Sequence, residues 1–166
     1  MKNFLFVFAL IVFLSACLTP TTIPLPDEPP NIPFKDSDNF DNLLSNTMRQ
    51  NLQASGKVEV QLASRIEPDE GEMPKRLDKW LAVIKKSGGN QDYEAIDDSM
   101  AGALPAILMP FEAIYEDISG WFEEKMYQPA KQYNVRLCYR RDDNLVSKIV
   151  FIERSKSNPD LRVCGN

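Results

Sequence analysis

The run Ile-Val-Phe-Ile at residues 149–152 constrains the fold most strongly. Successive side chains point to opposite faces of a strand, so a strand with this run is apolar on both faces. Such a strand is usually central in its sheet and covered on both sides. Apolar and polar residues alternate over residues 135–139, and Asp142-Asp143-Asn144 suits a turn. The pattern predicts a C-terminal β-hairpin in which residues 145–152 form the return strand.

Helical and extended patterns alternate in the earlier part of the chain. Residues 38–52 have apolar side chains at helical spacing, and residues 58–62 alternate as in a half-buried strand. The clearest helix lies between Pro74 and Gly88, and residues 91–96 are a short candidate strand. We therefore predict an α+β fold, with a small mixed or antiparallel sheet and a C-terminal hairpin packed against two to four helices. The apolar stripe of the clearest helix consists of Leu77, Trp80, Leu81 and Ile84.

Residues 100–121 contain more large apolar side chains than one amphipathic helix can bury. Pro105 and Pro110 interrupt the helical stripe, which predicts a short helix to about Leu108 and a second helix from Pro110 to about Tyr127. The apolar surplus either packs between these two helical pieces or meets another chain. Interfaces favour aromatic and Met side chains, so we predict a partner-binding surface here. Its expected residues are Leu108, Met109, Phe111 and Tyr115.

The chain opens with an apolar run, residues 4–14, that follows Lys2. A membrane-spanning helix needs about 20 apolar residues, and this run is shorter. A basic start, a short apolar core and small residues at its end are typical of a secretory signal peptide.

The end of this run, Leu14-Ser15-Ala16-Cys17, resembles the lipobox of bacterial lipoproteins. The resemblance implies cleavage before Cys17, lipidation of the Cys17 sulfur and an acylated N-terminus. The expected anchor is therefore lipid, and Leu18 in place of Asp implies the outer membrane, with the domain in the periplasm. The alternative is a free cysteine at the end of an ordinary leader.

Six of the twelve prolines lie in residues 18–34, which show neither helical nor strand periodicity. Such a segment favours extended polyproline II and acts as a spacer. We interpret it as a passive stalk, with a docking strip for an aromatic groove as the alternative. The predicted organisation is a signal peptide at residues 1–16, an acylated tether at 17–37 and one domain at 38–166.

Two further cysteines, Cys138 and Cys164, lie in the predicted domain. In an exported protein the expected state of such a pair is a disulfide. A reactive thiol is the alternative, because Arg136, Arg140 and Arg141 flank Cys138.

The composition limits the chemistry. The chain has 19 basic and 24 acidic residues, and this balance argues against binding to nucleic acid or to an anionic surface by charge. It has no His, which excludes Ser-His-Asp and Cys-His arrangements, and no glycine-rich phosphate loop, so we expect no cofactor. An acidic loop at residues 67–72 could supply an acid and a base, although a solvated loop is the simpler interpretation. Its carboxylates are Glu67, Asp69, Glu70 and Glu72.

Two functions remain open after these exclusions. The first is a non-enzymatic accessory or adaptor lipoprotein that binds another envelope protein. The alternative is a carboxylate-based hydrolase or a ligand-binding lipoprotein that acts on cell-wall or extracellular material.

Overall fold

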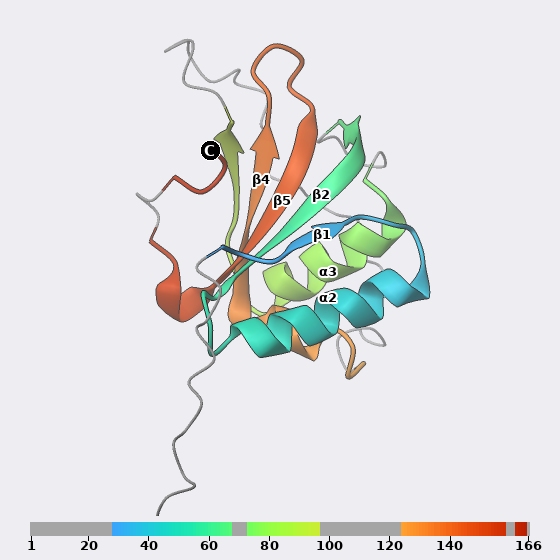
Figure 1. Ribbon diagram of the computed structural model, residues 1–166, viewed down its shortest axis with the longest axis vertical. Helices are drawn as coiled ribbons and strands as arrows, with labels where there is room; N and C mark the ends of the chain where they lie inside the picture. The colour runs from blue at the N-terminus through green and yellow to red at the C-terminus, as the bar shows by residue number, and fades with distance from the viewer. Residues whose placement is uncertain (1–27, 68–72, 97–123, 159–161, 166) are drawn as a thin grey trace, which may run out of the picture.

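The computed structural model describes residues 28–67, 73–96, 124–158 and 162–165. They form a five-stranded mixed sheet with two helices, α2 (Asp38–Asn51) and α3 (Lys75–Lys86), on one face (Figure 1). This architecture confirms the predicted α+β fold. The strands are β1 (Asn31–Pro33), β2 (Lys57–Ile66), β3 (Gln91–Ala95), β4 (Tyr133–Tyr139) and β5 (Val146–Glu153), and two short 3-10 turns are η1 (Gln128–Gln132) and η2 (Arg154–Lys156).

The strand order is β1-β2-β5-β4-β3, which places β5 at the centre, as predicted. β5 pairs antiparallel with both β2 and β4, and the β4-β5 pair is the expected hairpin. β1 and β3 are the edge strands, and each pairs in parallel with its neighbour. α3 connects β2 to β3, so these elements form a β-α-β unit that has the hairpin inserted between its two strands.

The main core lies between the sheet and the two helices. α3 buries the predicted stripe, and α2 buries Leu44 and Met48. The alternating residues of β2 are buried as expected, and Phe151 of β5 packs into the same core. The Trp80 and Tyr127 rings meet edge to face, with centroids 4.8 Å apart. Burying large apolar side chains stabilises the domain by about 2 kcal/mol each, and this core is therefore the main source of its stability.

The opposite face of the sheet is covered near β4 and β5 by the C-terminal strap, residues 162–165. Val150 and Ile152 of β5 are buried there together with Cys138 and Cys164. The two sulfurs form the predicted disulfide, with Cα atoms 5.4 Å apart, so neither cysteine is a free thiol.

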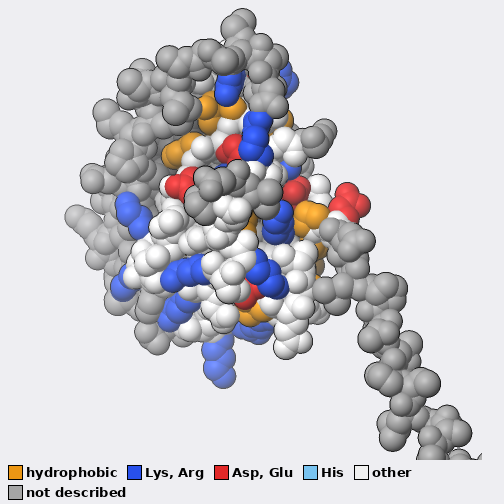
Figure 2. Space-filling model, turned by 90° about the vertical axis from the view of Figure 1, so that its left-hand side faces the viewer, with side chains coloured by type: hydrophobic (Ala, Val, Ile, Leu, Met, Phe, Trp, Pro, Cys, Tyr) orange, Lys and Arg blue, Asp and Glu red, His pale blue; other side chains and the backbone are white. Residues whose placement is uncertain are grey.

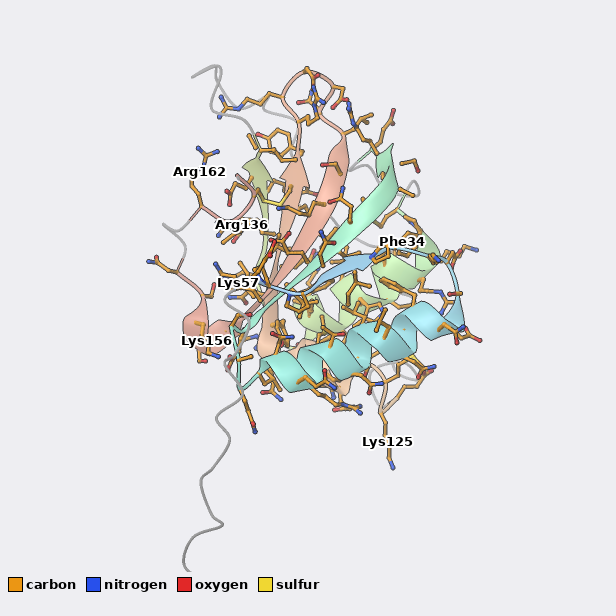
Figure 3. The ribbon with its side chains drawn as sticks, viewed as in Figure 1. Phe34, Lys57, Lys125, Arg136, Lys156 and Arg162 are labelled. Carbon is orange, nitrogen blue, oxygen red and sulfur yellow. A yellow bond between two sulfur atoms is a disulfide. The ribbon has the colours of Figure 1, made fainter. Side chains whose placement is uncertain are left out.

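A carboxylate holds the strap beside the disulfide. Glu94 accepts hydrogen bonds from the N–H groups of Val163 and Cys164, each at 2.9 Å, and from Arg136 at 2.9 Å. Burial raises the pKa of Glu94, but these donors outweigh that effect, and the net shift is downward. Figure 3 places Arg136 and Arg162 on this side of the sheet, and the Nε atom of Arg162 lies 3.7 Å from Glu94.

The folded chain begins earlier than Asp38, because β1 comes from residues assigned to the tether. The N–H of Glu59 donates to Pro30 at 2.9 Å, and the N–H of Phe34 donates to Gln61 at 2.7 Å. Ile32 is buried between these two contacts. Proline is tolerated in an edge strand, where no neighbour needs its missing N–H, and the proline-rich composition therefore concealed this strand.

The predicted helix from Pro110 to Tyr127 falls mostly outside the described residues. Its last part is described, and there the prediction is wrong, because residues 125–127 form turns that lead into η1. Side chains of α2 hold these turns: the Ser45 hydroxyl donates to Met126 at 2.7 Å, and Arg49 donates to Lys125 at 2.6 Å. Backbone carbonyls that accept such side-chain bonds satisfy their polar groups without a continuing helix.

We predict that losing the disulfide lowers the free energy of unfolding by about 3.5 kcal/mol, because the bond restricts the unfolded chain. Cys164→Ser should lower the melting temperature by about 10 °C, measured by circular dichroism. A reductant should lower the melting temperature of the parent protein equally and leave that of the variant unchanged. An unchanged melting temperature in the variant would show that the strap is held without the bond.

Candidate binding groove at the open end of β2

The candidate site lies where β2 extends beyond β1 (Figure 1). β1 pairs only with Glu59, Val60 and Gln61 of β2, and after Phe34 the chain turns away toward α2. On the other side the pairing with β5 is irregular between Gln61 and Ile66. Within the described part of the chain, residues 62–65 therefore have no ladder partner in β1 or in β5. We call residues 62–65 the open edge.

A groove of about 700 Å³ borders the open edge. Apolar side chains from four segments form part of its wall, and Phe34 is fixed by edge-to-face packing on the buried Phe40, with ring centroids 5.0 Å apart. Figure 3 shows Phe34 beside α3, where β1 ends. The lining residues are Phe34, Asp36, Ala63, Ser64, Arg65, Ile66, Glu67, Pro74 and Leu145.

The charged side chains of the groove differ in how they are paired. Arg65 forms an ion pair with Asp143 of the hairpin turn. The pKa of Asp143 is lowered, first by the hydrogen bond that its carboxylate accepts from the N–H of Leu145 and then by Arg65. Asp36 accepts a hydrogen bond from Arg76 at 2.9 Å, and this contact is the largest cause of the raised pKa of Arg76. Glu67 is exposed at the end of the groove.

A buried polar network between α2 and α3 is connected to the groove through Arg76 and Asp36. Arg76 also contacts Asp38 and Asp41, and the Asp41 side chain is only 3% exposed. The indole N–H of Trp80 donates to the other oxygen of Asp41 at 2.8 Å. Asp41 thereby links α2 to two residues of α3, and Arg76 links α3 to the chain that leaves β1. A buried carboxylate is tolerated only when it is paired and hydrogen-bonded in this way.

The groove contains two carboxylates, Asp36 and Glu67. A carboxyl group acts as a general acid near neutral pH when burial raises its pKa. The Asp36 side chain is 69% exposed and engaged by Arg76, and Glu67 is exposed. Among the described carboxyl groups, Asp78 has a pKa raised by burial, to about 6, and it does not line the groove. Within the described ranges, no three His, Cys, Asp or Glu side chains form a metal-binding group.

The site residues predicted from sequence do not come together in the groove. Glu67 lines the groove, whereas Cys138 and Cys164 lie on the opposite face of the sheet. The remaining predicted residues lie outside the described parts of the chain: Cys17, Asp69, Glu70, Glu72, Leu108, Met109, Phe111 and Tyr115.

Sequence reasoning missed most of the groove. Phe34 was assigned to the tether, and Arg65 and Leu145 had no distinguishing pattern. One signal was present: regular alternation in β2 stops after Leu62, where Ala63, Ser64 and Arg65 are consecutive exposed residues. Such a break is typical of an irregular strand edge.

The acidic surplus of the full chain is not found in the described residues, where Lys and Arg outnumber Asp and Glu. Figure 2 shows Lys and Arg side chains spread over one face of the molecule. Several cations among the described residues are paired, as in Arg136 with Glu94 and Lys156 with Glu153. The net charge of the whole sequence therefore differs in sign from that of the described residues.

No protein-family model matches the chain, and no curated protein or solved structure matches it either. Among the described residues, no helix has the length and apolar character that a membrane span requires.

We predict that Arg76→Met lowers the free energy of unfolding by about 3 kcal/mol, because it leaves the buried Asp41 without its cation. Urea unfolding followed by Trp fluorescence measures this loss. Asp38→Asn is the matched control: its carboxylate contacts the same guanidinium but is exposed, so its removal should cost much less. Equal losses in the two variants would contradict the importance of the buried pair.

The raised pKa of Asp78 leads to a second prediction, a pH-dependent change in the free energy of unfolding. Its folded pKa of about 6 lies above the ordinary value of 3.8, so the folded protein holds this proton more tightly than the unfolded chain. The stability that protonation of Asp78 provides is therefore present at low pH and is lost as the pH rises through about 6. Asp78→Asn should be more stable than the parent at pH 7.5, by about 2 kcal/mol, and this advantage should disappear toward pH 4. Urea unfolding at a series of pH values measures the difference, and an advantage that does not change with pH would contradict the assignment.

Proposed function

We propose that this protein is a lipid-anchored envelope lipoprotein of the outer membrane, with its domain in the periplasm, and that it acts as a non-enzymatic adaptor for another envelope protein. The observation that carries the adaptor role is the open edge of β2 beside a groove with a partly apolar wall. Natural sheets usually protect their edges, and an unpaired strand segment is a template for another chain. The lipobox-like Leu14-Ser15-Ala16-Cys17 supports the anchor.

The partner surface predicted at Leu108, Met109, Phe111 and Tyr115 remains part of this proposal. Large apolar side chains at this density are typical of interfaces as well as of cores. The groove and this segment are two separate candidate contacts, and they can be tested separately.

The anchor predicts the behaviour of Cys17→Ser. Because the thioether and the acyl chains hold the protein on the bilayer, the variant should leave the membrane fraction or accumulate as an uncleaved precursor. Cell fractionation with immunoblotting measures this, and Cys164→Ser is the control that should remain with the membrane. Normal processing and sedimentation of Cys17→Ser with the outer membrane would refute the lipoprotein assignment.

The adaptor role is tested by photo-crosslinking in native envelopes. A photoreactive amino acid at position 63 or 115 should capture a defined protein, identified by mass spectrometry. The same group at Lys86, which is exposed on α3 away from the groove, is the control. Absence of any captured protein at both positions would argue against the adaptor role.

One observation favours the alternative, a carboxylate-based hydrolase or ligand-binding lipoprotein: Asp36 and Glu67 line the same groove. Hydrolysis of purified cell-wall material that is lost in both Asp36→Asn and Glu67→Gln would support the alternative over the adaptor.

A further inference from the structure

We infer that the groove binds an extended peptide segment of the partner, which adds to the open edge of β2 as a strand and carries alternating apolar and basic side chains. The inference rests on the proposed adaptor function and specifies the partner's chemistry. Three independent observations support it: the backbone of β2, the form of the groove and its charge.

The backbone of β2 already accepts a parallel strand on this side. Glu59 donates its N–H to Pro30, and Gln61 accepts from Phe34, so the peptide groups of these alternate residues face β1. Ala63 is the next residue in this set, and β1 has ended before it. Ala63 itself is exposed, and its N–H has no bond to β1 or to β5 among the described residues. A strand in β-augmentation needs such an unpaired edge for its main-chain hydrogen bonds.

The size of the groove suits a short extended segment. Residues 62–65 span about 13 Å at a rise of about 3.3 Å per residue, which is the length of four residues of an added strand. The volume of about 700 Å³ lies beside these residues. Phe34, Ile66, Pro74 and Leu145 provide apolar contacts for the side chains on one face of the segment. Because side chains alternate along a strand, the other side chains of the bound segment point away from these apolar contacts.

The charge of the groove favours basic side chains at those positions. Its lining has two carboxylates, Asp36 and Glu67, and one guanidinium, that of Arg65. Arg65 is already neutralised by Asp143, and Arg76 beside Asp36 is shared among three carboxylates. The lining is therefore negative on balance, which favours Lys or Arg in the bound segment.

The probe for the test is the fluorescent heptapeptide acetyl-Lys-Val-Lys-Val-Lys-Val-Lys-amide, titrated with the full-length protein by fluorescence anisotropy. We expect saturable binding. A peptide of the same sequence with two N-methylated backbone amides should bind at least tenfold more weakly, because it cannot complete the ladder. A peptide with Glu in place of Lys should also bind several-fold more weakly. Equal affinity for the methylated peptide, or no binding of the parent peptide, would overturn the inference.

Two protein variants locate the site. Ala63→Pro removes the N–H at the open edge and should weaken binding at least tenfold, whereas Ala63→Ser keeps the backbone and should bind normally. Glu67→Lys should weaken binding of the Lys peptide several-fold and strengthen binding of the Glu peptide. The melting temperature of each variant is first compared with that of the parent protein. If Ala63→Pro fails to fold, the methylated peptide tests the same hydrogen bonds in the unaltered protein. Normal affinity in a folded Ala63→Pro would overturn the location.

Crosslinking distinguishes failure of this inference from failure of the adaptor role. A partner captured from position 115 but not from position 63 would refute strand addition at β2 while leaving the adaptor function intact. If neither position captures a protein, the result would argue against the adaptor function itself.

Discussion

The position of β5 determines the arrangement of the rest of the molecule. A strand whose side chains are apolar on both faces must be covered twice, and here the two coverings are very different. The helices α2 and α3 cover one face with a large core, while the other face is covered near Val150 and Ile152 by the strap. The described part of this covering contributes few apolar side chains, and a disulfide and the Glu94 carboxylate hold the strap in place. Among the described residues, covalent and charge-assisted contacts thus supplement the small apolar area on this face.

A second constraint connects the core to the groove. Asp41 is buried between the helices, where it binds both Arg76 and Trp80. Arg76 in turn contacts Asp36, which lines the groove. The geometry of the groove therefore depends on the same contacts that hold the two helices together. In the proposed binding role, this support would order the groove before a ligand arrives, which would reduce the entropy cost of binding.

Sequence reasoning predicted the elements whose periodicity is set by local burial. The alternation in β2 and β4, the doubly apolar β5 and the stripe of α3 all report which side chains face the core, and each of these predictions was confirmed. β1 could not be predicted, because a three-residue strand with a proline has no measurable period. The groove could not be predicted either, since it depends on where β1 leaves β2 and on how β5 pairs past Gln61. Those are relations between segments far apart in the sequence. Glu67 was a candidate only through its charge.

The parallel pairing of β1 and β2 has a mechanical consequence. β1 is the first described element along the chain, while the open edge lies toward the far end of β2. If the tether is fixed to a membrane and a partner holds the open edge, a pulling force acts on opposite ends of two parallel strands. Such a force shears the β1-β2 hydrogen bonds together instead of opening them one after another. Load would then pass between membrane and partner through β1, the shortest of the described strands, with Ile32 buried at the middle of its pairing with β2.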